Sequence, residues 1–190
     1  MIPLQTKEIA QLVQGQLIGA DIQIQSVSTD SRNITQGDLF IALKGPNFDG
    51  HQFAADVIAK GAVALIVEQQ LDLAVPQIIV ADTRLALGAL GAAVKQKVNP
   101  KSVAVTGSVG KTTVKEMMAA ILDRIGDVLA TAGNFNNDIG APLTLLRLTE
   151  QHQYAVMELG ANHVGEIGYT TGLVQPKVAG ILNIGTAHMG

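Results

Sequence analysis

The sequence predicts an α/β protein in which a small N-terminal α/β domain is followed by a domain built around a parallel sheet. Three observations predict this fold. Short apolar strands alternate with helical stretches, the alternation becomes a regular βαβ pattern after residue 100, and a glycine turn joins a strand to a helix at residues 103–113. We place the boundary near Ala81, which gives domains at 1–81 and 82–190.

The first domain is expected to hold two helices and four strands. Thr6 is a candidate N-cap for the first helix, and Gly15 is expected to end it. Alternating polar and apolar residues indicate the first strand, and glycine or proline turns border the others. The expected helices lie at residues 7–13 and 51–60, and the expected strands at 21–28, 38–43, 62–67 and 77–80.

The second domain begins with a helix that Asp82 caps and Asn99-Pro100 ends. Its strands are expected at residues 102–106, 127–130, 154–159 and 178–184, and its helices at 82–98, 111–125 and 139–148. This order predicts a parallel sheet covered by helices on both faces. Because a parallel sheet normally continues through another crossover helix, we expect the natural chain to extend beyond Gly190.

Composition excludes several classes of function. Hydrophobic residues make up 47% of the 190 residues, enough for a substantial core, and a net charge of −3 without a basic run argues against nucleic acid as a partner. The chain has no cysteine, which removes disulfides and thiolate chemistry. No signal peptide is evident, and the longest apolar run, residues 61–67, is too short to cross a bilayer. We expect a cytoplasmic protein without membrane insertion.

The strongest functional signal is the segment Gly107-Ser108-Val109-Gly110-Lys111-Thr112-Thr113, which follows an apolar strand. Glycines let consecutive backbone N–H groups turn toward a phosphate, and the helix N-terminus adds a favourable dipole. The lysine can reach the β- and γ-phosphates of ATP, and the first threonine hydroxyl can ligate Mg²⁺. The segment is two residues shorter than the general phosphate loop. The alternative is an ordinary glycine turn with a solvated lysine, which leaves the Lys-Thr pair unexplained.

Further candidates lie where strands end. Glu158 ends a buried strand and could hold Mg²⁺, or it could be a solvated strand-end acid. His188 follows the last strand, and a lone histidine is more often structural than a ligand. Asn136 and Asn137 could contact nucleotide or cap a helix. In the first domain, Ser31 and Arg32 with the loop Asn47-Phe48-Asp49 could hold a diphosphate-sugar ligand, although such segments also make ordinary turns.

Taken in order, these segments closely resemble the Mur ligase family over essentially the whole chain. The segments that carry the resemblance are Thr106-Gly-Ser-Val-Gly-Lys-Thr-Thr113, Asn134-Phe-Asn-Asn-Asp-Ile-Gly-Ala-Pro142, Glu158-Leu-Gly-Ala-Asn-His163 and Asn183-Ile-Gly-Thr-Ala-His188. The related ligase that adds the third peptide residue would show Ser-Ser-His where this chain has Leu159-Gly160-Ala161. A folylpolyglutamate synthase would lack Asp30-Ser31-Arg32.

The resemblance implies an ATP-dependent ligase of peptidoglycan synthesis that joins D-Ala-D-Ala to UDP-MurNAc-tripeptide through an acyl phosphate. It further implies that Ser31, Arg32 and residues 47–49 bind the UDP end, that residues 107–113 with Asn136 and Asn137 bind MgATP, and that Thr112, Glu158 and His188 surround magnesium. Lys111, Glu158 and His188 would be catalytic, and the protein would be a monomer. Because the family's carbamylated lysine and C-terminal domain would lie beyond Gly190, the alternative for this chain is a non-catalytic binding fragment.

Overall fold

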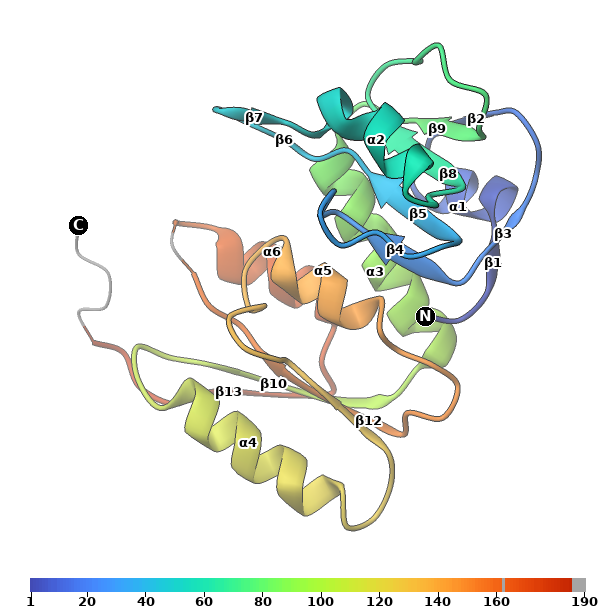
Figure 1. The fold of residues 1–190 in the computed structure, drawn as a ribbon. Helices are drawn as coiled ribbons and strands as arrows, with labels where there is room; N and C mark the ends of the chain where they lie inside the picture. The colour runs from blue at the N-terminus through green and yellow to red at the C-terminus, as the bar shows by residue number, and fades with distance from the viewer. Residues whose placement is uncertain (162, 186–190) are drawn as a thin grey trace. The chain divides into compact units, whose positions relative to one another are not determined.

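The computed structural model describes residues 1–161 and 163–185, and its chain divides into two compact units, residues 1–90 and 91–190 (Figure 1). The chain passes from the first unit to the second within α3 (Thr83–Val98). Asp82 caps this helix as predicted, because its Oδ1 accepts hydrogen bonds from the N–H groups of Arg84 (2.7 Å) and Leu85 (2.9 Å).

The first unit is built on a five-stranded mixed sheet with the order β2-β9-β8-β5-β4. Its strands β4, β5, β8 and β9 run parallel, and β2 is antiparallel to β9 at one edge. The bounds are β2 Gln16–Ile18, β4 Ser26–Ser28, β5 Asp38–Ile41, β8 Ala64–Val67 and β9 Gln77–Ile79. Every residue of β5 and β8 is buried, so these central strands are covered on both faces.

The remaining elements of this unit surround the sheet. They are β1 (Leu4–Gln5), α1 (Thr6–Leu12), β3 (Gln23–Ile24), β6 (Lys44–Gly45), β7 (Phe48–Asp49), the 3₁₀ helix η1 (Gly50–Phe53) and α2 (Ala54–Ala59). One buried cluster joins α2 to the sheet and contains Phe40, Ala42, Ala54, Val57, Ala62, Leu65 and Val67. Burying a side chain as large as Phe40 or Leu65 contributes about 1.5–3 kcal/mol.

Several details of the first domain differ from the sequence-based expectation. The helix expected at 51–60 is η1 followed by α2, and β1 and β2 were not expected. Thr6 is not the cap of α1: Gln5 holds that position without a side-chain bond, and the Thr6 hydroxyl is buried, where it accepts the N–H of Ile22 (2.9 Å). The single strand expected at residues 21–28 is two strands. β3 pairs with β1 in an antiparallel ribbon, and β4 joins β5 in the main sheet, so the chain changes partners at Gln25.

The second unit contains a four-stranded, fully parallel sheet with the order β11-β12-β10-β13. The strands are β10 (Lys101–Thr106), β11 (Val128–Ala130), β12 (Tyr154–Glu158) and β13 (Val178–Ile181). Val105 of β10 is in register with Glu158 of β12, so both strands end at the same edge of the sheet. The predicted parallel sheet is therefore confirmed, and this edge is where such sheets bind ligands.

Helices cover both faces of this sheet, as expected (Figure 1). α4 (Lys111–Leu122) packs on one face against β10, β11 and β12, and α5 (Gly140–Leu145) and α6 (Glu166–Val174) lie on the other. Helix α4 begins at Lys111 as predicted, whereas α5 is shorter than the expected 139–148. Sequence reasoning gave no bounds for α6 or for the β6–β7 hairpin.

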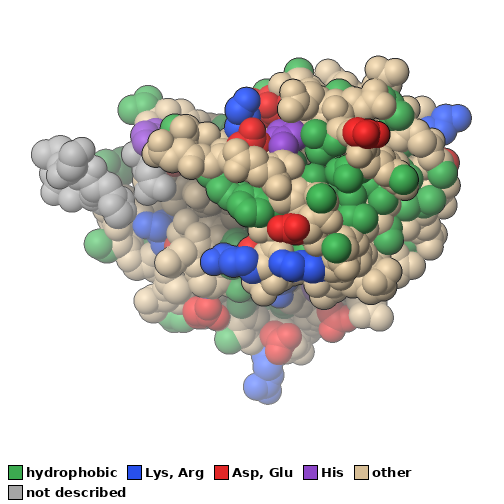
Figure 2. Space-filling model, turned by 45° about the horizontal axis from the view of Figure 1, so that its top comes forward, with side chains coloured by type: hydrophobic (Ala, Val, Ile, Leu, Met, Phe, Trp, Pro, Cys, Tyr) green, Lys and Arg blue, Asp and Glu red, His purple; other side chains and the backbone are tan. Residues whose placement is uncertain are grey.

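Two further observations concern the surface and the helices. On the face drawn in Figure 2, lysine and arginine side chains are interspersed with aspartate and glutamate, and they form no continuous basic stripe there. Within residues 1–161 and 163–185, none of the helices combines the length and apolar character needed to span a bilayer.

Candidate functional site

The loop between β10 and α4 has the backbone that a phosphate loop requires. Gly107 has φ +147° and Gly110, the N-cap of α4, has φ +83°, a region that residues with a Cβ rarely adopt. The first-turn N–H groups of α4, as in any helix, have no intrahelical acceptor. Gly110 has no side chain to accept their hydrogen bonds in its place. These N–H groups and the helix dipole make this end of α4 suited to an anion.

A cavity of about 310 Å³ opens beside this loop. The phosphate-loop residues on its wall are Gly107, Ser108 and Lys111, and its other walls come from Thr106, Asn136, Gly160, Ala161, Ile167, Ile181, Asn183, Ile184 and Gly185. Lys111 Nζ donates to the carbonyl oxygen of Gly107 (2.7 Å), which holds the ammonium group over the loop. An incoming phosphate would therefore meet a lysine already placed at the cavity wall.

Glu158 lies beside the phosphate loop and is only 3% exposed. Its Oε2 accepts a hydrogen bond from the Thr112 hydroxyl (2.9 Å), and its Oε1 accepts one from Asn136 Nδ2 (2.8 Å). Both of these donors are neutral. A buried carboxylate without a compensating cation is costly, so the environment that the described residues provide favours a bound positive charge.

Thr112 and Glu158 together fit a magnesium ion. Carboxylate and hydroxyl oxygens are ligands that Mg²⁺ prefers, and Mg²⁺ commonly uses one or two protein oxygens with phosphate and water completing its shell. No cluster of three or more His, Cys, Asp or Glu side chains occurs among residues 1–161 and 163–185. His188, the third predicted metal ligand, lies outside the described residues.

Thr131 and Lys115 hold the backbone around Glu158, and neither residue was singled out from the sequence. Thr131 Oγ1 accepts the N–H of Glu158 (3.0 Å), and Lys115 Nζ donates to the carbonyl oxygen of Thr131 (2.8 Å). Lys115 is 1% exposed, which is rare for lysine. Its position one turn after Lys111 was the signal that it shares the loop-facing side of α4.

The two asparagines predicted beside the nucleotide occupy different positions. Asn136 lines the cavity and binds Glu158, and its backbone carbonyl accepts the N–H of Gly160 (2.8 Å). Asn137 Oδ1 instead accepts the N–H of Gly140 (2.8 Å) and so caps the start of α5. In the loop itself, Val109 is exposed at the tip, and Thr113 is exposed in the first turn of α4.

The tip of the phosphate loop is held by Asn183, which begins one of the segments that resemble the family but was given no role from the sequence. Asn183 Oδ1 accepts the N–H groups of both Ser108 (2.9 Å) and Val109 (3.0 Å), and its Nδ2 donates to the Val109 carbonyl oxygen (2.9 Å). Gly185 N–H donates to Ser108 Oγ (2.8 Å) beside this contact. These partners lie about seventy-five residues apart, so no local pattern could reveal them.

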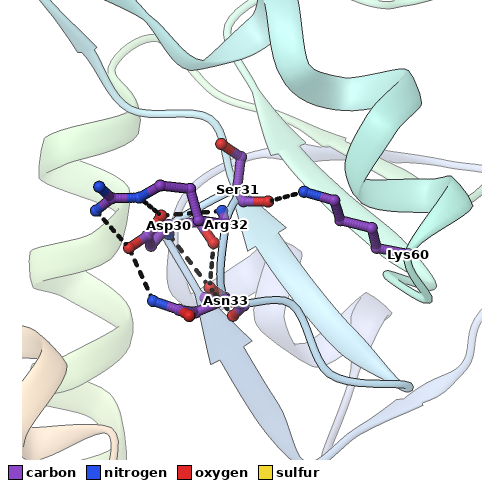
Figure 3. Close-up of polar contacts among 6 residues, drawn as sticks. Asp30, Ser31, Arg32, Asn33 and Lys60 are labelled. Carbon is purple, nitrogen blue, oxygen red and sulfur yellow. Dashed lines mark hydrogen bonds and ion pairs between the residues drawn. The ribbon is translucent and has the colours of Figure 1, made fainter.

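In the first unit, a cavity of about 530 Å³ is lined by Thr29, Asp30, Ser31, Arg32, Phe48 and Phe53. Asp30 and Arg32 form a bidentate ion pair on its rim, with Nε–Oδ1 and Nη2–Oδ2 distances of 2.8 Å (Figure 3). The guanidinium group, followed by the Arg32 N–H, holds the pKa of Asp30 well below its usual range. Lys60 Nζ donates to the carbonyl oxygen of Ser31 (2.7 Å), which fixes the same turn.

The β6–β7 hairpin brings Phe48 to this cavity, where its ring stacks on Phe53 with centroids 5.8 Å apart. Asp49 anchors the hairpin: its Oδ1 accepts the N–H of His51 (3.0 Å) and the proton of His51 Nδ1 (2.6 Å). These bonds lower the pKa of Asp49, the backbone bond more than the ring bond. Asn47 lies exposed at the hairpin turn and does not line the cavity.

Comparison with known proteins identifies the family. The family model described as the catalytic domain of the Mur ligase family matches residues 23–125, more than half of the chain. The chain belongs to the Mur ligase family. A second model, the Mur ligase middle domain, matches residues 105–190 and so includes the phosphate loop, Glu158 and Asn183.

Three proteins of the Mur ligase family illustrate what this chain is similar to. A UDP-N-acetylmuramoyl-tripeptide–D-alanyl-D-alanine ligase of Haemophilus influenzae is 53% identical over 195 residues, which are 100% of this chain and 43% of that protein. A crystal structure of MurF from Acinetobacter baumannii superposes with a TM-score of 0.95 at 52% identity, covering 99% of this chain and 42% of that one. MurF ligase from Thermotoga maritima in complex with ADP gives 0.79 at 33% identity, over 86% of this chain and 38% of that one. The chain spans about two fifths of the length of the curated relatives that match it over its full length.

Proposed function

We propose that this chain supplies the substrate-binding and ATP-binding parts of a ligase that joins D-alanyl-D-alanine to UDP-N-acetylmuramoyl-tripeptide in peptidoglycan synthesis. The observation that carries the proposal is the phosphate loop placed against a buried Glu158 that Thr112 holds at 2.9 Å. The similarity to D-alanyl-D-alanine ligases over the whole chain supports the choice of substrates. We assign the UDP substrate to residues 1–81 and MgATP to residues 82–190, and place the reaction in the cytoplasm with a monomeric enzyme.

In the ATP site, we assign roles from position to the described residues and from the family resemblance to His188. The first-turn N–H groups of α4 and Lys111 bind the β- and γ-phosphates, and Ser108 to Thr113 surround them. Thr112 and Glu158 hold Mg²⁺, with His188 as a further ligand, and the ion supplies neutralising charge when bound. Asn136 keeps the Glu158 carboxylate oriented through its 2.8 Å bond. The ADP complex of the Thermotoga maritima relative supports a nucleotide at this site.

The reaction that we propose proceeds in two steps. A terminal carboxylate oxygen of the tripeptide attacks the γ-phosphorus, the bond to the β-γ bridging oxygen breaks, and ADP leaves. The D-Ala-D-Ala amine then attacks the acyl carbon of the resulting acyl phosphate, loses a proton and expels inorganic phosphate. Lys111 neutralises charge on the transferring phosphoryl group, because positioning and electrostatics supply most of the acceleration in phosphoryl transfer.

In the first unit, the cavity beside Arg32 is our candidate for the UDP end of the substrate. The Arg32 guanidinium is pre-oriented by Asp30 and retains donors for a diphosphate oxygen. The Ser31 hydroxyl adds a donor, and the stacked Phe48 ring offers an apolar face to the uracil. Asn47 and Asp49 complete the hairpin that carries Phe48.

The test is D-Ala-D-Ala-dependent ADP formation by a full-length ligase that carries residues 1–190. We expect Lys111→Ala to lower this rate by about 10²–10³-fold without a change in melting temperature, as loss of a positioned charge typically does. Lys177→Ala, which removes an exposed lysine from the same unit, is the matched control. ADP formation that does not depend on the dipeptide, or an unaffected Lys111 variant, would contradict the proposal.

The second candidate function is binding without turnover by residues 1–190 themselves. The observation that favours it is that the similar ligases are more than twice as long as this chain. In that case the chain binds the UDP substrate saturably and releases no phosphate from ATP. Calorimetry and a phosphate-release assay on the same preparation distinguish the two.

A further inference from the structure

At the tip of the phosphate loop, the backbone N–H groups donate hydrogen bonds to another part of the protein. Two consecutive N–H groups, those of Ser108 and Val109, converge on one oxygen, Asn183 Oδ1, at 2.9 and 3.0 Å. Asn183 Nδ2 returns a bond to the Val109 carbonyl oxygen at 2.9 Å, so the carboxamide is satisfied on both sides. The Ser108 hydroxyl and Gly185 N–H add a further contact at 2.8 Å.

This arrangement divides the loop into two parts. The tip N–H groups are occupied by Asn183, whereas the first-turn N–H groups of α4 have no intrahelical acceptor and stay available to an anion. The loop is two residues shorter than a general phosphate loop, so it has less backbone with which to stabilise its own shape. Gly107 passes close to Asn183, because a Cβ at that position would lie 3.2 Å from Asn183 N.

We infer that Asn183 is a positioning residue for the polyphosphate of ATP. From the segment that follows β13, it supplies the support that the shortened loop lacks. The inference deepens the proposed function and rests on it. Asn183 is given this role through the loop backbone that its side chain binds. It holds Ser108 and Val109 so that the following N–H groups and Lys111 are presented to the phosphates in one fixed geometry.

The contact itself is tested by amide hydrogen exchange, measured by NMR on this chain without nucleotide. We expect Asn183→Ala to speed exchange at Ser108 and Val109 by about fivefold, with little change elsewhere, since a net hydrogen bond is worth about 1 kcal/mol. Asn183→Asp retains the accepting oxygen and should keep these two amides protected. Asn99→Gly, a carboxamide removed from an exposed left-handed position, is the matched control. Unchanged exchange at Ser108 and Val109 in Asn183→Ala overturns the inference.

The functional consequence is tested in a full-length ligase that carries residues 1–190. We expect Asn183→Ala to raise the KM for ATP about tenfold, with kcat at saturating ATP within about twofold and the KM for the UDP substrate unchanged. An unchanged KM for ATP, or equal losses for every substrate with a lower melting temperature, overturns the positioning role. An unaffected Lys111→Ala variant would instead contradict the proposed function, and the exchange result would still stand.

Discussion

Hydrogen bonds hold the buried Glu158 carboxylate in one orientation, which suits a bound cation. Its two carboxylate oxygens accept bonds from Thr112 and Asn136, and its N–H is held by Thr131. We predict that Glu158→Gln, which keeps the shape and removes the charge, raises the Mg²⁺ concentration needed for half-maximal activity by about tenfold or more. Titration of activity with Mg²⁺ measures this, with Glu150→Gln at an exposed position as the control. Identical Mg²⁺ titration curves for Glu158→Gln and the parent would show that Glu158 does not bind the metal.

Asp30 provides a prediction about pH. Its pKa is lowered in the folded chain by the Arg32 side chain, so the pair stabilises the fold above the unfolded pKa of about 3.9, and this contribution is lost as the pH falls through the folded pKa. Arg32→Gln should raise the pKa of Asp30 toward its ordinary value. An NMR titration of the Asp30 carboxyl carbon checks this, with Arg147→Gln as the control. A pKa that stays low would mean that the ion pair is not its cause.

At the same scale, the sequence predicted the residues of the phosphate loop and Glu158, but not what holds them. Lys111 and Thr112 follow a glycine turn, a local pattern with a known physical use. Asn183 contacts this loop from a distant strand end, and Lys115 would read from composition alone as a solvated lysine. The contact of Asn183 depends on which strands become neighbours in the sheet, which local pattern does not specify. The spacing of Lys115 from Lys111 indicated its side of α4 but not its burial or its bond to Thr131.

The element that positions Asn136 is the segment leading into α5. Gly140 begins α5, and a Cβ at this position would collide with the backbone of Phe135. We predict that Gly140→Ala costs about 1–3 kcal/mol of stability and weakens ATP binding, because it displaces the loop that brings Asn136 to Glu158. Denaturant unfolding and ATP affinity are the measurements.

Gly172→Ala is the matched control for this prediction. Gly172 lies inside α6, where an added Cβ meets nothing within 4 Å, so alanine should stabilise the chain by up to about 1 kcal/mol. Equal effects of the two substitutions would show that the Phe135 contact does not matter.

The elements themselves were largely predictable, and the exceptions have physical causes. Alternation of apolar residues runs from Ile22 to Ile24 and breaks at Gln25-Ser26, two consecutive polar residues. The chain changes partner at this break, which the single strand expected at residues 21–28 did not take into account. Thr6 has the side chain of a helix cap, but burial against residues 20–22 outweighed that local role. The two-residue strands of the β6–β7 hairpin are too short for a periodic signal.

For the whole chain, we predict that residues 1–190 bind UDP-MurNAc-tripeptide weakly and release no phosphate from ATP at a useful rate. The proposed UDP contacts all lie within the first unit, whereas acyl-phosphate formation needs nucleotide, metal and carboxylate held together in a closed site. Calorimetry with the UDP substrate and a phosphate-release assay with ATP, Mg²⁺, UDP-MurNAc-tripeptide and D-Ala-D-Ala test this. Robust dipeptide-dependent release would show that residues 1–190 suffice for catalysis.

Helix α3 limits where the chain can be divided into its two compact units. The boundary between the two compact units falls between Leu90 and Gly91, in the middle of a sixteen-residue helix. An expression clone that stops at Leu90 would end in a half-helix with four carbonyl groups deprived of their donors, and one that starts at Gly91 would begin without the Asp82 cap. A cut at this boundary therefore falls within a helix, whereas a cut before Asp82 leaves α3 and its cap whole. A protease that cuts only unstructured backbone should fail to separate the two units between Leu90 and Gly91.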